Sequence, residues 1–173
     1  MRAVTLRAPR EVEVVDKPAP ALVEPGDVVI RVLASGICGS DLHLYTGRVP
    51  LEQGFTLGHE YVGEIVEAGA GVGALQAGDR VVGSFQTACG TCWLCRRGLF
   101  HKCDRTRTFG HGAAFGNLEG TQAELALVPQ AEQTLRRVPE AVPDELALFA
   151  GDALATGYHA ARSVEPGQTV VVL

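Results

Sequence analysis

The chain has 173 residues, of which 46% are hydrophobic and 20% charged, and its net charge is −5. This length fits one ordinary domain with a substantial core. The acidic balance argues against a nucleic-acid or anionic-membrane partner, and no apolar run approaches the roughly 20 residues that a membrane span needs. The amino terminus lacks the pattern of an export signal, so we expect a cytoplasmic protein.

The first part of the chain is predicted to form short strands, because 21 glycines and 9 prolines favour a turn-rich β body over a helical bundle. Val28, Ile30 and Val32 alternate with other residues and share one face of a strand. The expected strands cover residues 1–7, 11–15, 27–34, 61–68 and 80–84. Between the third and fourth, Ser40 or Asp41 is expected to cap a short helix.

The second part is predicted to begin with a lobe at residues 86–106, which has no hydrophobic periodicity. The elements expected after it are a Gly-rich loop at 110–120, a strand at 122–128, a helix opening at 143–145, a helix at 152–163 and an apolar strand at 169–173. That last run, TVVVL, is typical of the first strand of a nucleotide-binding unit. We therefore divide the chain into a domain at 1–163 and the start of a truncated nucleotide-binding domain at 164–173.

Four of the five cysteines lie in one short segment, CGTCWLCRRGLFHKC. The spacing C-x2-C-x2-C-x7-C lets four thiolates surround one tetrahedral zinc ion, and such a closed site is structural. Free surface thiols or two disulfides are the alternatives. An odd cysteine count without an export signal favours zinc. The predicted ligands are Cys89, Cys92, Cys95 and Cys103. They fill the coordination shell, so His101 is not expected to bind the metal.

Three further residues suggest a second, open zinc site. Taken singly, Cys38 is explained by packing, His59 by a structural role and Asp152 by the start of a helix. Taken together with their neighbours, they are predicted to form a set of metal ligands. An open zinc site performs chemistry, because its fourth position takes water or substrate.

Four motifs resemble the medium-chain, zinc-dependent alcohol dehydrogenase family, in the order that the family has them. GHEYVGEIVEAGAGV resembles its zinc signature and GICGSDLH its first-ligand segment. The cysteine segment resembles its structural-zinc lobe, and GDALATGY resembles the segment of its third catalytic ligand. The resemblance points to the branch of threonine, sorbitol and secondary-alcohol dehydrogenases.

The resemblance implies roles for individual residues around the catalytic metal. It makes Cys38, His59 and Asp152 the three zinc ligands. Asp41 matches the carboxylate that orients the ligand histidine, and Glu60 matches an acid behind the metal. Such supporting partners tune metal affinity.

Other matched positions concern the proton, the substrate and the cofactor. Ser40 matches the hydroxyl that takes the alcohol proton and His43 the outer member of that relay; a helix cap and a surface histidine are the alternatives. Phe85 matches a wall of the substrate pocket, although it is equally explained by the core. Thr156 matches a nicotinamide contact. The remaining histidines, His111 and His159, are expected to be solvent or core residues.

The fold that the resemblance implies is mainly β, a GroES-like, irregular and partly open β-barrel with edge helices and the first Rossmann strand at its end. The implied activity is reversible oxidation of an alcohol to an aldehyde or ketone, with NAD or NADP as hydride acceptor and two zinc ions per chain, one catalytic and one structural. We expect homo-dimers or homo-tetramers of the full-length protein, and an inactive isolated fragment.

Two other classes stay open at this point. A zinc-stabilised binding module keeps the four-cysteine lobe but has no need for Cys38, Ser40, Asp41, His59 and Glu60 together. A zinc-independent reductase or quinone oxidoreductase on the same fold normally lacks both ligand sets. Counting the metal ions separates the three classes.

Overall fold

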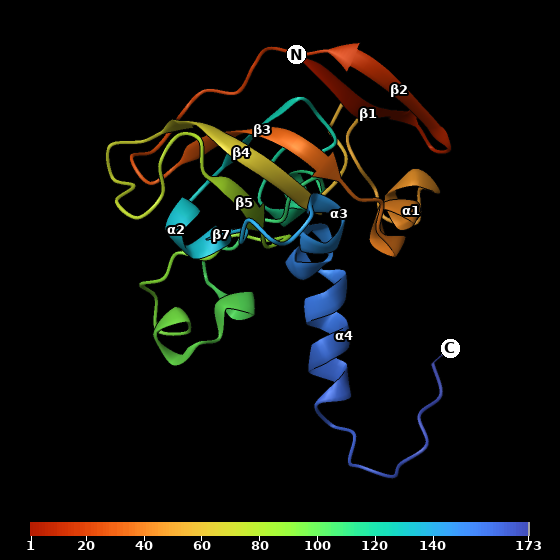
Figure 1. Cartoon of the computed structure of the whole chain (residues 1–173). Helices are drawn as coiled ribbons and strands as arrows, with labels where there is room; N and C mark the ends of the chain where they lie inside the picture. Colours follow the sequence, from red (N-terminus) through yellow and green to blue (C-terminus); the bar gives the residue numbers. More distant parts are fainter. Residues whose placement is uncertain (173) are drawn as a thin grey trace.

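Two antiparallel sheets form the body of the protein in the computed structural model, which describes residues 1–172 (Figure 1). One sheet pairs β1 (Arg2–Ala8) with β2 (Glu11–Asp16). The other has the order β6-β3-β4-β5-β7, with bounds Val28–Ser35 (β3), Tyr61–Ala68 (β4), Arg80–Gly83 (β5), Leu125–Val128 (β6) and Leu135–Arg137 (β7). Neither sheet closes on itself, which agrees with the partly open architecture expected from the sequence.

Short helices lie at the edges of these sheets. They are α1 (Gly39–Tyr45), α2 (Ala131–Thr134), α3 (Asp144–Ala147) and α4 (Ala153–Ala161), with single 3-10 turns η1 (Cys95–Arg97), η2 (Phe100–Lys102), η3 (Ala113–Phe115) and η4 (Leu148–Gly151). The predicted cap of α1 is wrong by two or three residues. Cys38 is the N-cap, and its backbone N–H donates to Asp41 Oδ2 at 2.9 Å. Asp41 therefore closes the first turn from inside the helix.

The main core lies against the five-stranded sheet. Ile30 pairs with Ile65 between β3 and β4, and both are fully buried. Tyr61 and Phe109 pack edge to face with ring centroids 5.2 Å apart, and neither side chain is exposed. Burial of this kind supplies the main driving force for the fold. It also fixes the end of β3 and the start of β4, which lie three residues before Cys38 and two residues after His59.

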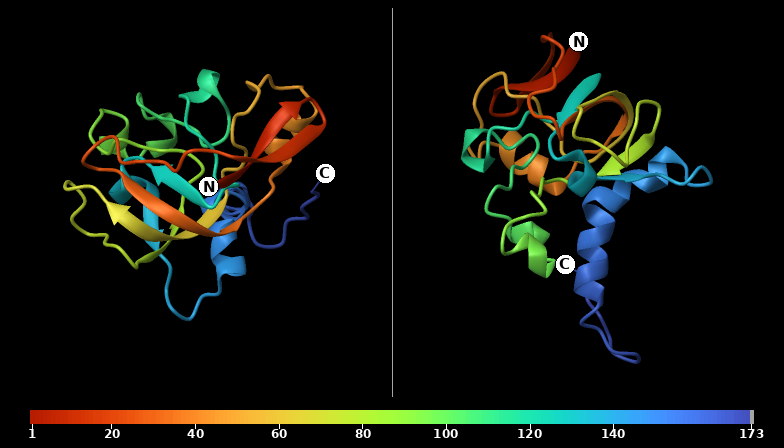
Figure 2. Two further views of the ribbon diagram at one scale, coloured as in Figure 1. Left: turned by 90° about the horizontal axis from the view of Figure 1, so that it is seen from above. Right: turned by 90° about the vertical axis from the view of Figure 1, so that its left-hand side faces the viewer.

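The cysteine lobe and α4 project from the same side of the sheets (Figures 1 and 2). The apolar side chains Leu154 and Tyr158 of α4 are 60% and 69% exposed. The strand predicted at 169–173 is not formed over residues 169–172, and Leu173 lies outside the described residues. A strand needs a neighbour for its ladder of hydrogen bonds, and none of the described strands lies beside this segment.

The structure also contains two elements that the sequence did not predict, α2 and β7. The three residues of β7, Leu-Arg-Arg, bury only the leucine. A run this short carries no readable alternation, and its pairing with β5 decides its conformation. No helix among residues 1–172 is long and apolar enough to cross a membrane.

Candidate metal centres

Three segments that lie far apart in the sequence bring one predicted ligand set together. Cys38 precedes α1, His59 precedes β4 and Asp152 precedes α4. Their ligand atoms all lie within 4.8 Å of one another. Asp152 Oδ2 lies 3.3 Å from His59 Nε2 and 3.8 Å from Cys38 Sγ. The structure therefore assembles a sulfur, a nitrogen and an oxygen donor around one point.

Backbone geometry fixes the histidine of this set. Gly58 has φ +92°, and a Cβ there would lie 2.5 Å from Gln122 Cγ, so only glycine fits before His59. The His59 side chain is 1% exposed, and its Nδ1 lies 3.1 Å from Asp41 Oδ1. Since Asp41 Oδ2 also accepts the Cys38 N–H, one carboxylate supports two of the three predicted ligands.

The electrostatics of the centre favour a positive charge. Burial of the His59 imidazole lowers its pKa, but the attraction of the Asp41 carboxylate, whose Oδ1 lies 3.1 Å from Nδ1, followed by that of Cys38, outweighs burial and raises the pKa to about 9. Asp152 adds a third acidic group against the same ring. A cation at this point is therefore stabilised by groups on several sides.

The donor set fits zinc. Tetrahedral coordination with zinc–ligand distances of about 2.0–2.3 Å places neighbouring ligand atoms about 3.3–3.8 Å apart. The two separations measured from Asp152 Oδ2, 3.3 and 3.8 Å, lie in that range. Three protein ligands leave a fourth position open. Ser40 borders the centre, with its Oγ 3.2 Å from His59 Nε2.

The residue that follows the predicted ligand His59 in the sequence carries a further buried carboxylate. Glu60 is 5% exposed, and its Oε1 has no hydrogen-bond partner among the described residues. Its other oxygen lies so close to Gly36 that a Cβ there would approach it to 2.6 Å. A buried carboxylate without a donor is costly unless a cation or proton compensates it.

The other predicted site residues differ in how close they lie to the ligands. The half-buried Phe85 ring meets the His59 ring edge to face, with centroids 6.4 Å apart. Thr156 Oγ1 donates to Asp152 Oδ1 at 3.0 Å, so it supports the predicted carboxylate ligand. Sequence reasoning missed this contact, although the i,i+4 spacing on a helix was a usable signal. His43 is exposed on α1.

One histidine expected in solvent or core lies against the centre instead. The His111 ring centroid is 5.1 Å from that of His59, and its other neighbour is Phe115 at 5.6 Å. His111 belongs to the Gly-rich loop, and no motif in the sequence links it to the ligands. His159, in contrast, is exposed on α4 as expected.

The second centre lies in the cysteine lobe. All five cysteines of the chain are free thiols, and the Sγ atoms of four of them lie within 4.8 Å of one another: Cys89, Cys92, Cys95 and Cys103. A tetrahedral four-sulfur zinc site places its sulfurs about 3.8 Å apart, so this cluster fits zinc. His101 is exposed on η2 and stands outside the set.

Backbone amides support these sulfurs. The N–H of Cys92 donates to Cys89 Sγ at 3.3 Å, and that of Cys95 donates to Cys92 Sγ at 3.4 Å. The N–H of Thr91 is the main group that lowers the pKa of Cys89 to about 5, whereas burial raises the pKa of Cys95 to about 12. Amide donors aimed at sulfur stabilise thiolates, which are the form that binds metal.

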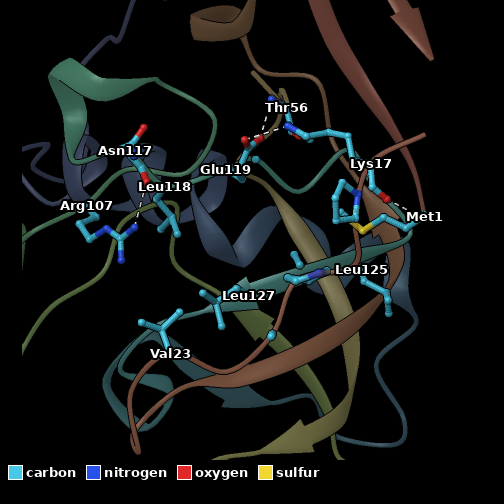
Figure 3. A pocket seen from close by; sticks show the side chains of 15 residues that line it. Met1, Lys17, Val23, Thr56, Arg107, Asn117, Leu118, Glu119, Leu125 and Leu127 are labelled. Carbon is cyan, nitrogen blue, oxygen red and sulfur yellow. Dashed lines mark hydrogen bonds and ion pairs between the residues drawn. The ribbon is translucent and has the colours of Figure 1, made fainter. Parts of the chain in front are cut away.

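A separate cavity of about 350 Å³ lies near the amino terminus (Figure 3). Its charged groups already have partners. Lys17 Nζ lies 2.8 Å from Glu119 Oε1, and Arg107 donates to the carbonyls of Gly116 and Asn117. None of the residues of the two metal centres lines this cavity. Its features are those of a structural void.

Comparison with known proteins agrees with this geometry. Residues 24–140 match the family "Alcohol dehydrogenase GroES-like domain". Zinc-type alcohol dehydrogenase B of Aspergillus flavus is 40% identical over 98% of this chain and 39% of its own length. L-threonine 3-dehydrogenase of Pyrococcus horikoshii is 40% identical over 77% of this chain and 36% of its own.

A solved structure gives the same result for the fold. The alcohol dehydrogenase TADH from Thermus sp. ATN1 is 47% identical, with a TM-score of 0.92 over 94% of this chain and 47% of that one. The chain thus spans less than half the length of each of these three relatives. It belongs to the GroES-like domain family of the zinc-dependent, medium-chain alcohol dehydrogenases.

Proposed function

We propose that the chain carries the catalytic centre of an enzyme that reversibly oxidises an alcohol to an aldehyde or ketone, with NAD or NADP as hydride acceptor. The observation that supports this most strongly is the convergence of Cys38, His59 and Asp152 around one point. Three protein ligands on a tetrahedral zinc leave the fourth position for water or substrate. A zinc-stabilised binding module accounts for the four-cysteine lobe but not for this second ligand set.

The residues divide the work of the centre. Zinc, when held by Cys38, His59 and Asp152, supplies a Lewis acid that acidifies an alcohol in one direction and polarises a carbonyl in the other. Asp41 orients the His59 ring through the 3.1 Å contact with Nδ1. Thr156 restrains the Asp152 carboxylate through its other oxygen.

Ser40 is the proposed acceptor of the alcohol proton. Its Oγ lies 3.2 Å from His59 Nε2, the nitrogen that faces the proposed metal, so it borders the open position. His43 lies three residues further along α1 and is exposed, which suits delivery of the proton to solvent. Phe85 contributes an apolar wall beside His59 and helps to keep water away from the reacting carbon.

The rest of the proposal concerns the whole protein. The match covers 39% of the length of zinc-type alcohol dehydrogenase B of Aspergillus flavus, and residues 1–172 contain no doubly wound sheet of the kind that binds dinucleotides. We therefore place cofactor binding mainly outside this chain, with Thr156 as its contact from this side. The 173-residue chain is expected to bind zinc without turnover, and the full-length protein is expected to be a homo-dimer or homo-tetramer in the cytoplasm.

Elemental analysis of zinc tests the two centres separately. The purified chain is expected to hold two zinc ions, and Cys38→Ser is expected to reduce the count to one by removing the open site. Cys92→Ser is expected to reduce the count to one and also to lower the unfolding temperature, because a structural zinc contributes folding free energy. A count of one that Cys38→Ser leaves unchanged would contradict the proposed catalytic centre and favour the binding module.

A further inference from the structure

Gln122 connects the two segments that carry Cys38 and His59, although it belongs to neither ligand set. It lies three residues before β6, and its side chain is half-buried. Its Nε2 lies 3.0 Å from the Gly36 carbonyl oxygen, and because a carbonyl only accepts, the NH2 group faces it. Gly36 comes two residues before Cys38. The mechanism proposed above makes no use of this contact.

The backbone of Gln122 is bonded to the segment that leads to the ligand histidine. Its N–H donates to the Leu57 carbonyl at 2.9 Å, and the N–H of Thr121 donates to the Gly58 carbonyl at 3.0 Å. From the opposite direction, the N–H of Val4 in β1 donates to the Gln122 carbonyl at 2.8 Å. The side chain therefore starts from a backbone that is held on both sides, so its amide is well placed to hold another segment.

Few contacts hold the two residues that join β3 to Cys38. The N–H of Gly36 donates to the Glu60 carbonyl at 2.9 Å, which continues the pairing with β4 by one residue. Ile37 is 77% exposed, so packing of its side chain does little to hold it. The backbone of Cys38 itself bonds within the first turn of α1. The amide of Gln122 is therefore the contact that fixes the direction in which the chain leaves β3.

That direction matters for a metal bound at the open centre. Zinc requires its ligands at nearly fixed distances, about 2.3 Å for a cysteine sulfur and about 2.0–2.1 Å for a histidine nitrogen. Cys38 and His59 come from different segments, so a shift of one segment against the other disturbs both distances to the ion. Gln122 bonds to both segments through groups of one residue, and it thereby sets their separation.

We propose that Gln122 is a positioning residue of the open centre, whose amide holds the segment of Cys38 against the segment of His59 and so sets the separation of the two ligand atoms. The proposal rests on the proposed function, because it takes these residues to bind the catalytic metal. It adds a residue that lies outside the ligand set and outside the four sequence motifs.

The test measures metal binding by the 173-residue chain and needs no turnover. Zinc affinity at each centre is determined by competition with a chelator, in the wild type and in Gln122→Met, which keeps the length of the side chain but removes the donor. Loss of one net hydrogen bond is expected to weaken zinc binding at the open centre about three- to tenfold and to leave the four-cysteine centre unchanged. Gln122→Asn, whose amide is one carbon too short to reach Gly36, is expected to show the same selective loss.

Cobalt(II) in place of zinc reports the arrangement of the ligands, because its visible spectrum depends on their geometry. The difference between the spectra of the wild type and Cys38→Ser isolates the open centre, and Gln122→Met is expected to alter this difference spectrum. Gln76→Met makes the same exchange at an exposed side chain outside both ligand sets. It is expected to match the wild type in both affinities and in the spectrum.

The possible contrary results have different meanings. Unchanged open-centre affinity and an unchanged cobalt spectrum in both Gln122 variants would overturn the positioning role. Equal weakening at the two centres would also overturn it, because that result would assign Gln122 to the stability of the whole fold. A wild-type chain from which Cys38→Ser removes no zinc would instead refute the proposed function, and the role of Gln122 with it.

Discussion

Replacing Asp41 by asparagine tests whether one carboxylate supports both Cys38 and His59. Asp41 is 6% exposed in its side chain, lies 3.1 Å from His59 Nδ1 and accepts the Cys38 N–H at 2.9 Å. Asparagine offers one oxygen and one NH2 group, and the NH2 group has to face one of these two donors. Asp41→Asn therefore loses a charge and at least one of the two contacts.

The magnitude follows from these contacts. Loss of a group that supports a metal ligand lowers metal affinity about 10- to 100-fold, which is about 1.4–2.7 kcal/mol. A single hydrogen bond to a charged group contributes about 1.5–3 kcal/mol, which agrees with that range. We therefore expect Asp41→Asn to bind zinc at the open site 10- to 100-fold more weakly than the wild-type chain does.

The assay is a titration of the zinc-loaded chain with a competing chelator. Asp144→Asn provides the matched control, since Asp144 pairs with Arg80 at 2.8 Å on a part-exposed surface and belongs to neither ligand set. It is expected to leave both zinc affinities unchanged. An Asp41→Asn chain that holds the open-site zinc within twofold of the wild-type affinity would refute the argument that Asp41 organises the ligands.

Two other predictions concern pH and a backbone position. The pKa of His59 is about 9 in the fold against about 6.5 in the unfolded chain, so protonation of its ring stabilises the metal-free fold. This stabilisation is fully present below about pH 6.5 and is lost as the pH rises through about 9. Urea unfolding of chelator-treated protein should show a loss of up to about 3 kcal/mol between pH 6.5 and 9.5; an equal loss in His59→Gln would assign the dependence elsewhere. Gly58→Ala combines a φ of +92° with a Cβ 2.9 Å from the Gln122 backbone nitrogen, so it should cost at least about 2 kcal/mol and weaken open-site zinc binding. Gly26→Ala, where a Cβ meets nothing within 4 Å, is its control, and equal effects of the two changes would contradict the steric argument.

The sequence predicted most of the strands, because their apolar residues alternate. Residues 61–68 match β4 at both ends, and the strand expected at 27–34 differs from β3 by one residue at each end. The short β7 escaped prediction, since pairing with β5 decides its conformation. The apolar run at 169–172 showed the opposite error, because strong β propensity does not form a strand without a partner.

The residues of the candidate site also differ in how far the sequence could predict them. The four thiols were predictable from local spacing alone, and their Sγ atoms do meet. Cys38, His59 and Asp152 were suggested by their residue types and neighbours, and the resemblance strengthened the prediction, because no local pattern brings three separate segments together. His111 was missed for the same reason. Its place beside His59 depends on the close contact between Gly110 and Gly58, which no periodicity encodes.

The ligands of the two centres are separated by different lengths of chain, so a metal at each centre restricts the conformational entropy of the unfolded chain to a different extent. Cys38 and Asp152 are 114 residues apart, whereas Cys89 and Cys103 are 14 apart. A metal that joins two positions acts as a cross-link, and its entropic effect grows with the logarithm of the loop that it closes. On that scale the open centre restricts the unfolded chain by about 2 kcal/mol more than the four-cysteine centre does. The site proposed for chemistry is thus also the longer cross-link of the two, and it ties the start of α1 to the start of α4.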